Sequence, residues 1–276
     1  MSGHEFGLPE IFEHEAQGYL ATVYQDIQHV LKVPVVNFIF RTLAFYEDFL
    51  GIAWQQVRPN MLTVEMEEAA HEIRYPDVSL KLPSVDWRKI YDDETIQKIR
   101  KIIFTFNYVN PKLLLIASAW SESLGSRPIE GVGMSSGFIQ PGIIPGLPKI
   151  RMVKIEKAAP QVQSLLLDII KQHHAYDAAS DYRALANYPQ FLSIGWNALK
   201  PYIGSKEYTL LKERIKTKSI ESVHNSMRFP ISFSTNDLAQ YYYPRDIAGI
   251  LGIVSMFQDL LPGLIIEMEV FRQMIR

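Results

Sequence analysis

Apolar residues recur along the chain at three- and four-residue steps, the spacing of one helix face. Asp92 or Asp93 is expected to cap the clearest such segment, because a side-chain oxygen there satisfies a free backbone N–H. No run alternates like a β-strand, and residues 80–87 are expected to form a loop. The pattern predicts an all-α protein. The clearest stripe is Ile96, Ile99, Ile103, Phe106, Asn110, Leu113 and Ala117.

The chain also contains an internal repeat. Residues 24–59 align with residues 166–201 without a gap at a shift of 142, and residues 96–115 align with 247–266 at a shift of 151. Most shared positions are apolar and fall at helical spacing, so they indicate one core face used twice. The Trp54/Trp196 pair is interpreted as repeated core. Other identities in the first alignment are Asp26/Asp168, Arg41/Arg183, Leu43/Leu185, Tyr46/Tyr188, Phe49/Phe191 and Pro59/Pro201.

A segment rich in glycine and proline separates the two copies and is typical of a connector. We therefore expect a first helical repeat at 1–124, a connector at 125–150 and a second repeat at 151–276. Two diverged copies in one chain predict an intramolecular pseudo-dimer with an approximate two-fold axis. Such a fusion makes further dimerisation unnecessary without forbidding a homodimer.

Two core-facing positions are polar in only one copy. Asn110 lies on the apolar stripe, whereas its counterpart is Leu261, and Asp181 corresponds to Ile39. Burying an amide without partners costs about 1–3 kcal/mol, so a polar residue there needs a reason. Each position also has a purely structural interpretation. Asn110 would be a buried amide with hydrogen-bond partners inside the protein, and Asp181 would be an acidic residue stabilised in the first turn of a helix.

Taken together, these two positions favour a shared interface between the halves. There a carboxylate and an amide would hold and deprotonate a water molecule. Asp177 or Ser180 is expected to cap the helix that carries Asp181.

Composition narrows the functional classes. Lys and Arg total 28 against 30 Asp and Glu, which does not suit a nucleic-acid-binding protein. The absence of cysteine excludes disulfides, thiolate metal sites and cysteine nucleophiles.

The N-terminal 17 residues lack a basic region followed by an apolar stretch, so no secretory signal is expected. Residues 247–271 are too interrupted by polar residues to span a bilayer and are expected to form a buried helix pair. We expect a cytoplasmic protein.

The sequence resembles the group I (D,L-specific) 2-haloacid dehalogenases. FNYVNPKLLL at 106–115, with SES at 121–123 and RP at 127–128, is similar to that family's first signature, and ASDYRALANYP at 179–189 is similar to its second. VYQDIQHVLKVP at 23–34 resembles its N-terminal segment.

This resemblance implies hydrolysis of 2-haloalkanoic acids by direct attack of water at C2, with inversion, without a covalent intermediate and without a cofactor or metal. It implies that Asp181 is the base and that Asn110 holds the water. The resemblance places Ser180 and Phe38 in the pocket wall, with Tyr182 beside them. The expected partner is a small carboxylic acid, with neither nucleic acid nor membrane involved. Arg127 is a weak candidate for binding the substrate carboxylate.

The sequence departs from the family at two wall positions. Val35 stands where the family has a tryptophan, and Leu113 stands where it has an aromatic residue. The water-handling pair is kept while the walls differ, so the identity of the substrate is open. Two alternatives remain: a hydrolase acting on another small substrate, or a non-enzymatic helical module that binds a small acid or a protein.

A di-iron bundle is a rival interpretation, since such sites use paired Glu-x-x-His motifs. Glu68 and His71 have this spacing, as do Glu221 and His224, but the two pairs do not coincide under either repeat shift. His173 and His174 are adjacent and point in different directions on a helix, so a solvent-facing or helix-end role is expected for both.

Overall fold

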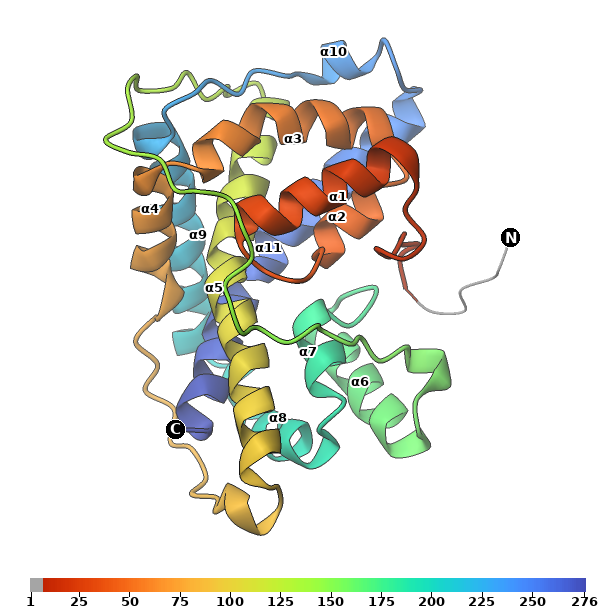
Figure 1. The fold of residues 1–276 in the computed structure, drawn as a ribbon, viewed down its shortest axis with the longest axis vertical. Helices are drawn as coiled ribbons and strands as arrows, with labels where there is room; N and C mark the ends of the chain where they lie inside the picture. The colour runs from red at the N-terminus through yellow and green to blue at the C-terminus, as the bar shows by residue number, and fades with distance from the viewer. Residues whose placement is uncertain (1–6) are drawn as a thin grey trace.

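The computed structural model describes residues 7–276, an assembly of helices around two long central ones (Figure 1). Within these residues β pairing is confined to two isolated bridges, Thr63 with Phe138 and Ile129 with Ile231. The all-α prediction is confirmed. Residues 1–6, part of the segment for which no secretory signal is expected, lie outside the described residues.

Helices of the first half lead to the long helix α5. They are α1 (Gly18–Leu31), α2 (Phe38–Leu43), α3 (Glu47–Met61), α4 (Val64–Arg74), the 3₁₀ helix η1 (Trp87–Lys89) and α5 (Asp93–Leu124). As predicted, Asp92 caps α5, and its side chain accepts a hydrogen bond from Thr95 N at 2.7 Å. The predicted loop at 80–87 is also present, apart from Trp87, which begins η1.

Helices of the second half lead in the same way to the long helix α11. They are η2 (Ile155–Lys157), α6 (Pro160–His173), α7 (Ser180–Leu185), α8 (Pro189–Ile203), α9 (Lys206–Ser226), α10 (Thr235–Leu238) and α11 (Pro244–Met274). The prediction of a helix pair over residues 247–271 was wrong. The segment is one continuous helix, and Pro262 lies inside it.

Matching positions of the two halves form matching structure. The bounds of α6, α7 and α8 are those of α1, α2 and α3 moved by 142 residues. Both tryptophans are buried in the core, as interpreted from the repeat. Trp54 Nε1 donates to Asp26 at 2.8 Å, and Trp196 Nε1 donates to Asp168 at 2.8 Å. Each aspartate also binds a cation one turn beyond the tryptophan, Arg58 in the first half and Lys200 in the second.

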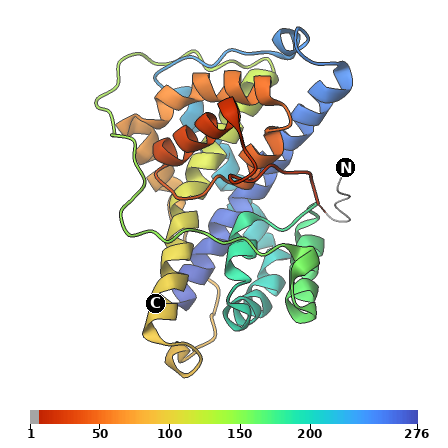
Figure 2. The ribbon, with the colours of Figure 1, turned by 45° about the vertical axis from the view of Figure 1, so that its right-hand side comes forward.

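The long helices α5 and α11 pack against each other along the middle of the molecule (Figures 1 and 2). Both are long and apolar enough to cross a membrane by length and composition, but 94% of the most apolar window of α5 and 56% of that of α11 is buried within the protein. Burial in the core accounts for the apolar character of α5 and for about half of the apolar window of α11. Helix α5 contacts α7, and α11 contacts α2, so each long helix reaches a short helix of the opposite half.

Residues 125–154 join the halves as an extended segment over the outside of the helices (Figure 1). Backbone hydrogen bonds tie this segment to the first half. Val64 N donates to Gly137 O at 3.0 Å, and Gly142 N donates to His29 O at 2.8 Å.

The matched aspartates allow a paired test of the fold. Asp26→Ala and Asp168→Ala each remove one hydrogen bond to an indole and one ion pair, so each is expected to lower the free energy of unfolding by about 1–2 kcal/mol. Chemical denaturation monitored by tryptophan fluorescence measures both losses. Asp86→Ala serves as the control, because this exposed residue makes only a loose contact with Lys89 at 3.6 Å. If the two variants lose widely different free energies of unfolding, the two indole–aspartate hydrogen bonds are not equivalent.

Candidate active site

The structure brings together the two polar positions that the repeat singled out. Asp181 is the second residue of α7, and Asn110 lies in the middle of α5. Asn110 Nδ2 donates to Asp181 Oδ1 at 2.7 Å, and the two residues are 1% and 2% exposed. Asn110 Oδ1 is buried without a hydrogen-bond partner among the described residues. The pair therefore offers a carboxylate and a free amide oxygen inside the protein.

The start of α7 differs from the prediction. Ala179 is the N-cap residue and no side chain caps the helix, so the expectation that Asp177 or Ser180 would do so was wrong. The Asp177 carboxylate instead accepts a hydrogen bond from Ala178 N at 2.7 Å, and Ser180 is already the first helical residue. Ser180 Oγ accepts a hydrogen bond from Arg41 at 3.2 Å, which occupies the oxygen that a cap would use.

Burial controls the charge of Asp181. Removal from water raises the pKa of its carboxyl to about 7, while the hydrogen bond from Asn110 and a backbone hydrogen bond lower it. The negative charge of Glu267 raises this pKa further, and the positive charge of His173 opposes that effect. A carboxyl with this pKa accepts a proton far more readily at neutral pH than an exposed aspartate does.

The predicted wall residues are all buried. Ser180 and Tyr182 flank Asp181 in α7, and Leu113 is three residues beyond Asn110 in α5. Phe38 begins α2 and packs edge-on against Phe257, with ring centroids 5.4 Å apart. Val35, which precedes α2, is also part of the core. The Tyr182 hydroxyl does not act as an open wall group, because it donates to Glu267 at 2.6 Å.

An arginine–glutamate cluster that the sequence analysis missed lies beside Ser180. Arg41, fully buried on α2, donates to Glu10 at 2.7 Å and to the carbonyl of Val36. Arg183, its repeat counterpart on α7, donates to the other oxygen of Glu10 at 2.5 Å. One carboxylate from the N-terminal segment thus joins two repeat-related guanidinium groups. The shared Arg41/Arg183 identity was the available signal, but nothing in the repeat pointed to Glu10.

A second missed cluster surrounds Glu267 of α11. This fully buried carboxylate accepts hydrogen bonds from Tyr182 and Tyr208 and contacts His173 Nε2 at 3.0 Å. His173 ends α6, as its expected helix-end role implies, but its side chain is buried; His174 is the C-cap residue. The second repeat alignment ended at residue 266. One position further, Glu267 corresponds to the apolar Ile116, and this polar departure was the available signal.

The Glu-x-x-His motifs identified in the sequence do not come together as a metal site within the described residues. Among residues 7–276, no cluster of three His, Asp or Glu side chains is arranged to hold a metal ion. His224 Nε2 lies 2.9 Å from Glu122, and Arg127 forms a two-pronged ion pair with the same carboxylate. Arg127 therefore already has a carboxylate partner.

Comparison with known proteins shows the family to which this chain belongs. Residues 34–182 match the family described as "Halocarboxylic acid dehydrogenase DehI", and the chain belongs to this family. It is 31% identical to a configuration-inverting 2-haloacid dehalogenase of Alcaligenes xylosoxydans xylosoxydans, over 94% of this chain and 90% of that protein. It is 30% identical to a configuration-inverting 2-haloacid dehalogenase of Pseudomonas sp. (strain 113), over 96% and 90% of the two chains.

The fold comparison agrees. A D-2-haloacid dehalogenase solved in complex with L-LA superposes with a TM-score of 0.90 at 26% identity, over 99% of this chain and 97% of that one. The resemblance noted in the sequence is confirmed at the level of the family, whose characterised relatives are 2-haloacid dehalogenases.

Stability should reveal the buried charge of Asp181. Its folded pKa lies above the unfolded value, so the native state binds more protons between about pH 4 and pH 7, and stability falls as pH rises through that window. Asp181→Asn keeps an acceptor for Asn110 and removes this loss. We expect the variant to be more stable than wild type by about 1–4 kcal/mol at pH 8.

Thermal or urea unfolding at pH 8 and at pH 4 measures this effect, and the difference between the two proteins should nearly vanish at pH 4. A variant that is less stable than wild type at pH 8 would show that the carboxylate is well compensated where it lies.

Proposed function

We propose that this chain is a 2-haloacid dehalogenase in which Asp181 activates a water molecule for attack on C2 of a 2-haloalkanoic acid. The observation that carries the proposal is the buried hydrogen bond between Asp181 and Asn110, residues of two helices from opposite halves. Family membership and the activities of the relatives support the same reaction.

The chemistry follows from these two side chains. The Asp181 carboxylate takes a proton from water while the water oxygen forms a bond to C2 and the carbon–halogen bond breaks. Asn110 Oδ1, the amide oxygen without a partner among the described residues, accepts the second hydrogen of the water and orients it. The halide departs from the opposite face, so C2 inverts and the product is a 2-hydroxy acid. In this scheme the Asp181 carboxylate activates the water, so none of the steps uses a cofactor or metal.

We propose that the halves at 1–124 and 151–276, linked by residues 125–150, form an intramolecular pseudo-dimer. The equal bounds of three helix pairs and the matched indole–aspartate bonds support this arrangement. Contacts between α5 and α7 create the reacting site. The related contacts between α11 and α2 bring Leu261 and Ile39, the apolar counterparts of Asn110 and Asp181, to the matching interface.

The substrate we propose is a small 2-haloacid of either configuration, bound near Ser180, Phe38, Tyr182 and the two departures from the family, Val35 and Leu113. Smaller side chains at the last two positions favour acids with a bulkier group on C2 than 2-chloropropionate carries. Two relatives are named as configuration-inverting 2-haloacid dehalogenases, which supports inversion at C2. We also propose a cytoplasmic protein, supported by the packing of both apolar helices inside the molecule, nearly complete for α5 and partial for α11.

Loss of the base should abolish turnover. Asp181→Asn is expected to lower the rate of halide release from 2-bromopropionate at least about a hundredfold, because a general base contributes 10²–10⁴. Asp177→Asn is the matched control. Asp177 lies four residues earlier and is also a partly buried acid, with a pKa raised to about 6 by burial, and it should retain activity. Equal rates in wild type and Asp181→Asn would remove Asp181 from the mechanism.

Isotope labelling distinguishes direct attack by water from an ester on Asp181. With enzyme in excess over (R)- or (S)-2-bromopropionate in H₂¹⁸O, the first turnover should place ¹⁸O in the 2-hydroxy product, with inverted configuration for each enantiomer. Mass spectrometry of the peptide containing Asp181 should show no label. An unlabelled first product with ¹⁸O in that peptide would establish a covalent route, and turnover of only one enantiomer would disprove action on both.

A further inference from the structure

The Glu267 cluster has no counterpart in the first half. At the repeat shifts, its four members correspond to four apolar residues that are all buried in the first-half core. The polar set is Glu267, His173, Tyr182 and Tyr208, and the matching apolar set is Ile116, Leu31, Phe40 and Met66.

The apolar set shows that the fold itself does not require polar groups at these positions. Replacing a buried ion pair by well-packed apolar residues is often neutral or stabilising, so the pair is a poor source of stability. The four polar residues occur together only in the half that carries Asp181. A role in the chemistry of that half accounts for this asymmetry.

The cluster lies next to the base. Tyr182 directly follows Asp181, its hydroxyl donates to Glu267 at 2.6 Å, and its ring centroid lies 5.4 Å from that of His173. The charges of Glu267 and His173 both act on the Asp181 carboxyl, in opposite directions. Burial of the pair preserves this influence, because screening by water is weak inside the protein.

The pair is held ionised by its own contacts. His173 and the two tyrosine hydroxyls keep the pKa of Glu267 below its ordinary value against the opposing effect of burial. In turn, Glu267 raises the pKa of His173 above its ordinary value, although burial opposes this as well. The contact therefore favours the charged form of each residue, an imidazolium beside a carboxylate.

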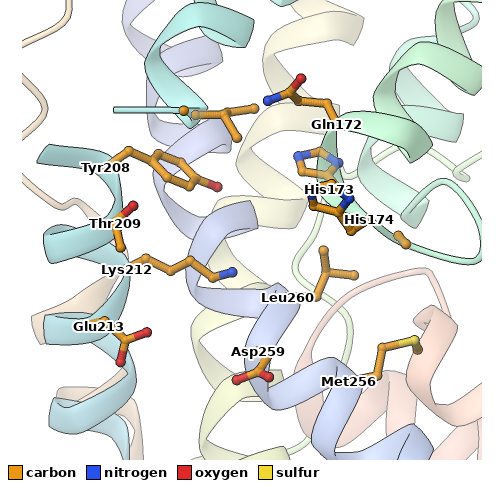
Figure 3. Close-up of a pocket in the computed structure, with 13 residues that line it drawn as sticks. Gln172, His173, His174, Tyr208, Thr209, Lys212, Glu213, Met256, Asp259 and Leu260 are labelled. Carbon is orange, nitrogen blue, oxygen red and sulfur yellow. The ribbon is translucent and has the colours of Figure 1, made fainter. Parts of the chain in front are cut away.

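One side of the cluster borders a cavity of about 500 Å³. His173 from the end of α6 and Tyr208 from α9 point toward one another across it, and Lys212 extends into the space between them (Figure 3). Neither Asp181 nor Asn110 lines this cavity. His173 thus borders this cavity on a side of the cluster that Asp181 and Asn110 do not line.

We propose that the Glu267–His173 pair, held by Tyr182 and Tyr208, controls the protonation of Asp181 and so sets the pH range of the reaction. This inference rests on the proposed function of Asp181 as the base. Glu267 and His173 act as positioning residues in the electrostatic sense, since they act on the base and do not touch the reacting atoms.

The other groups around Asp181 are neutral or bind partners outside the Glu267 cluster. Asn110 on α5 is neutral, and Arg41 on α2 and Arg183 on α7 both bind the single carboxylate of Glu10. Asp177, before α7, lies 3.9 Å from Arg183. Glu267 on α11 and His173 on α6 therefore act on the Asp181 carboxyl with opposite charges. A single substitution at either residue changes the net electrostatic effect on Asp181 directly.

The two single substitutions should act in opposite directions. Glu267→Gln removes the negative charge, and His173, which then lacks its partner, becomes neutral in its buried position; ionisation of Asp181 becomes easier. His173→Gln removes the cation, but the hydrogen bonds from Tyr182 and Tyr208 still favour the charged form of Glu267, so ionisation of Asp181 becomes harder. We expect the acid limb of the pH–rate profile to move down in Glu267→Gln and up in His173→Gln, each by roughly half a pH unit or more.

Two readouts test this proposal. The first is the pH dependence of kcat for halide release from 2-bromopropionate. The second is the titration of Asp181 itself by NMR in protein labelled with ¹³C at the aspartate carboxyl, assigned by the signal lost in Asp181→Asn. His174→Asn is the control, since this neighbour lines the same cavity and its left-handed backbone conformation suits asparagine. Its profile should match wild type.

Opposite shifts in the two variants support the proposal. An unmoved acid limb, or shifts in the same direction, overturns it even if kcat falls. If one variant does not fold, the shift and sign in the other decide. Should wild type release no halide from any haloacid, the proposed function fails, and the ¹³C titration of Asp181 still shows whether the pair controls its charge.

Discussion

Placing an ionisable carboxylate where water scarcely reaches it is the constraint on which this structure depends. Asp181 is almost fully enclosed, and its main stabilising contact, the amide of Asn110, comes from a helix of the other half. Neither half can complete this environment alone. The long helices α5 and α11, which cross the molecule to reach the opposite half, bring the two partners together.

Much of this arrangement was readable from the sequence, because diverged repeats supply their own comparison. Apolar spacing predicted the helices, and the polar departures at Asn110 and Asp181 identified the pair that the structure joins. The resemblance to the dehalogenase family pointed to the same two residues, and membership of the family is confirmed. The role of each residue stays a proposal.

Other features depend on contacts that no local pattern records. Glu10 reaches Arg183 across 173 positions, and neither residue has a spacing that reveals the other. Ser180 was expected to cap its helix by local propensity, but a guanidinium from the other half engages its hydroxyl. Long-range partners of this kind override local preference. The two helices expected in residues 247–271 are one helix for a similar reason. Packing of α11 against α5 maintains the helix through Pro262.

The bridge from Glu10 to both arginines also bears on how the chain reaches this form. During synthesis, Glu10 can pair with Arg41 once 31 further residues have been made, whereas Arg183 follows 173 residues after Glu10. Until then, the carboxylate oxygen of Glu10 that binds Arg183 in the folded protein has no native partner. Closing so long a loop is entropically costly, which makes this bridge a late event in folding. The surroundings of Ser180 are therefore completed only after both helical units exist, and the segment that carries Glu10 settles late.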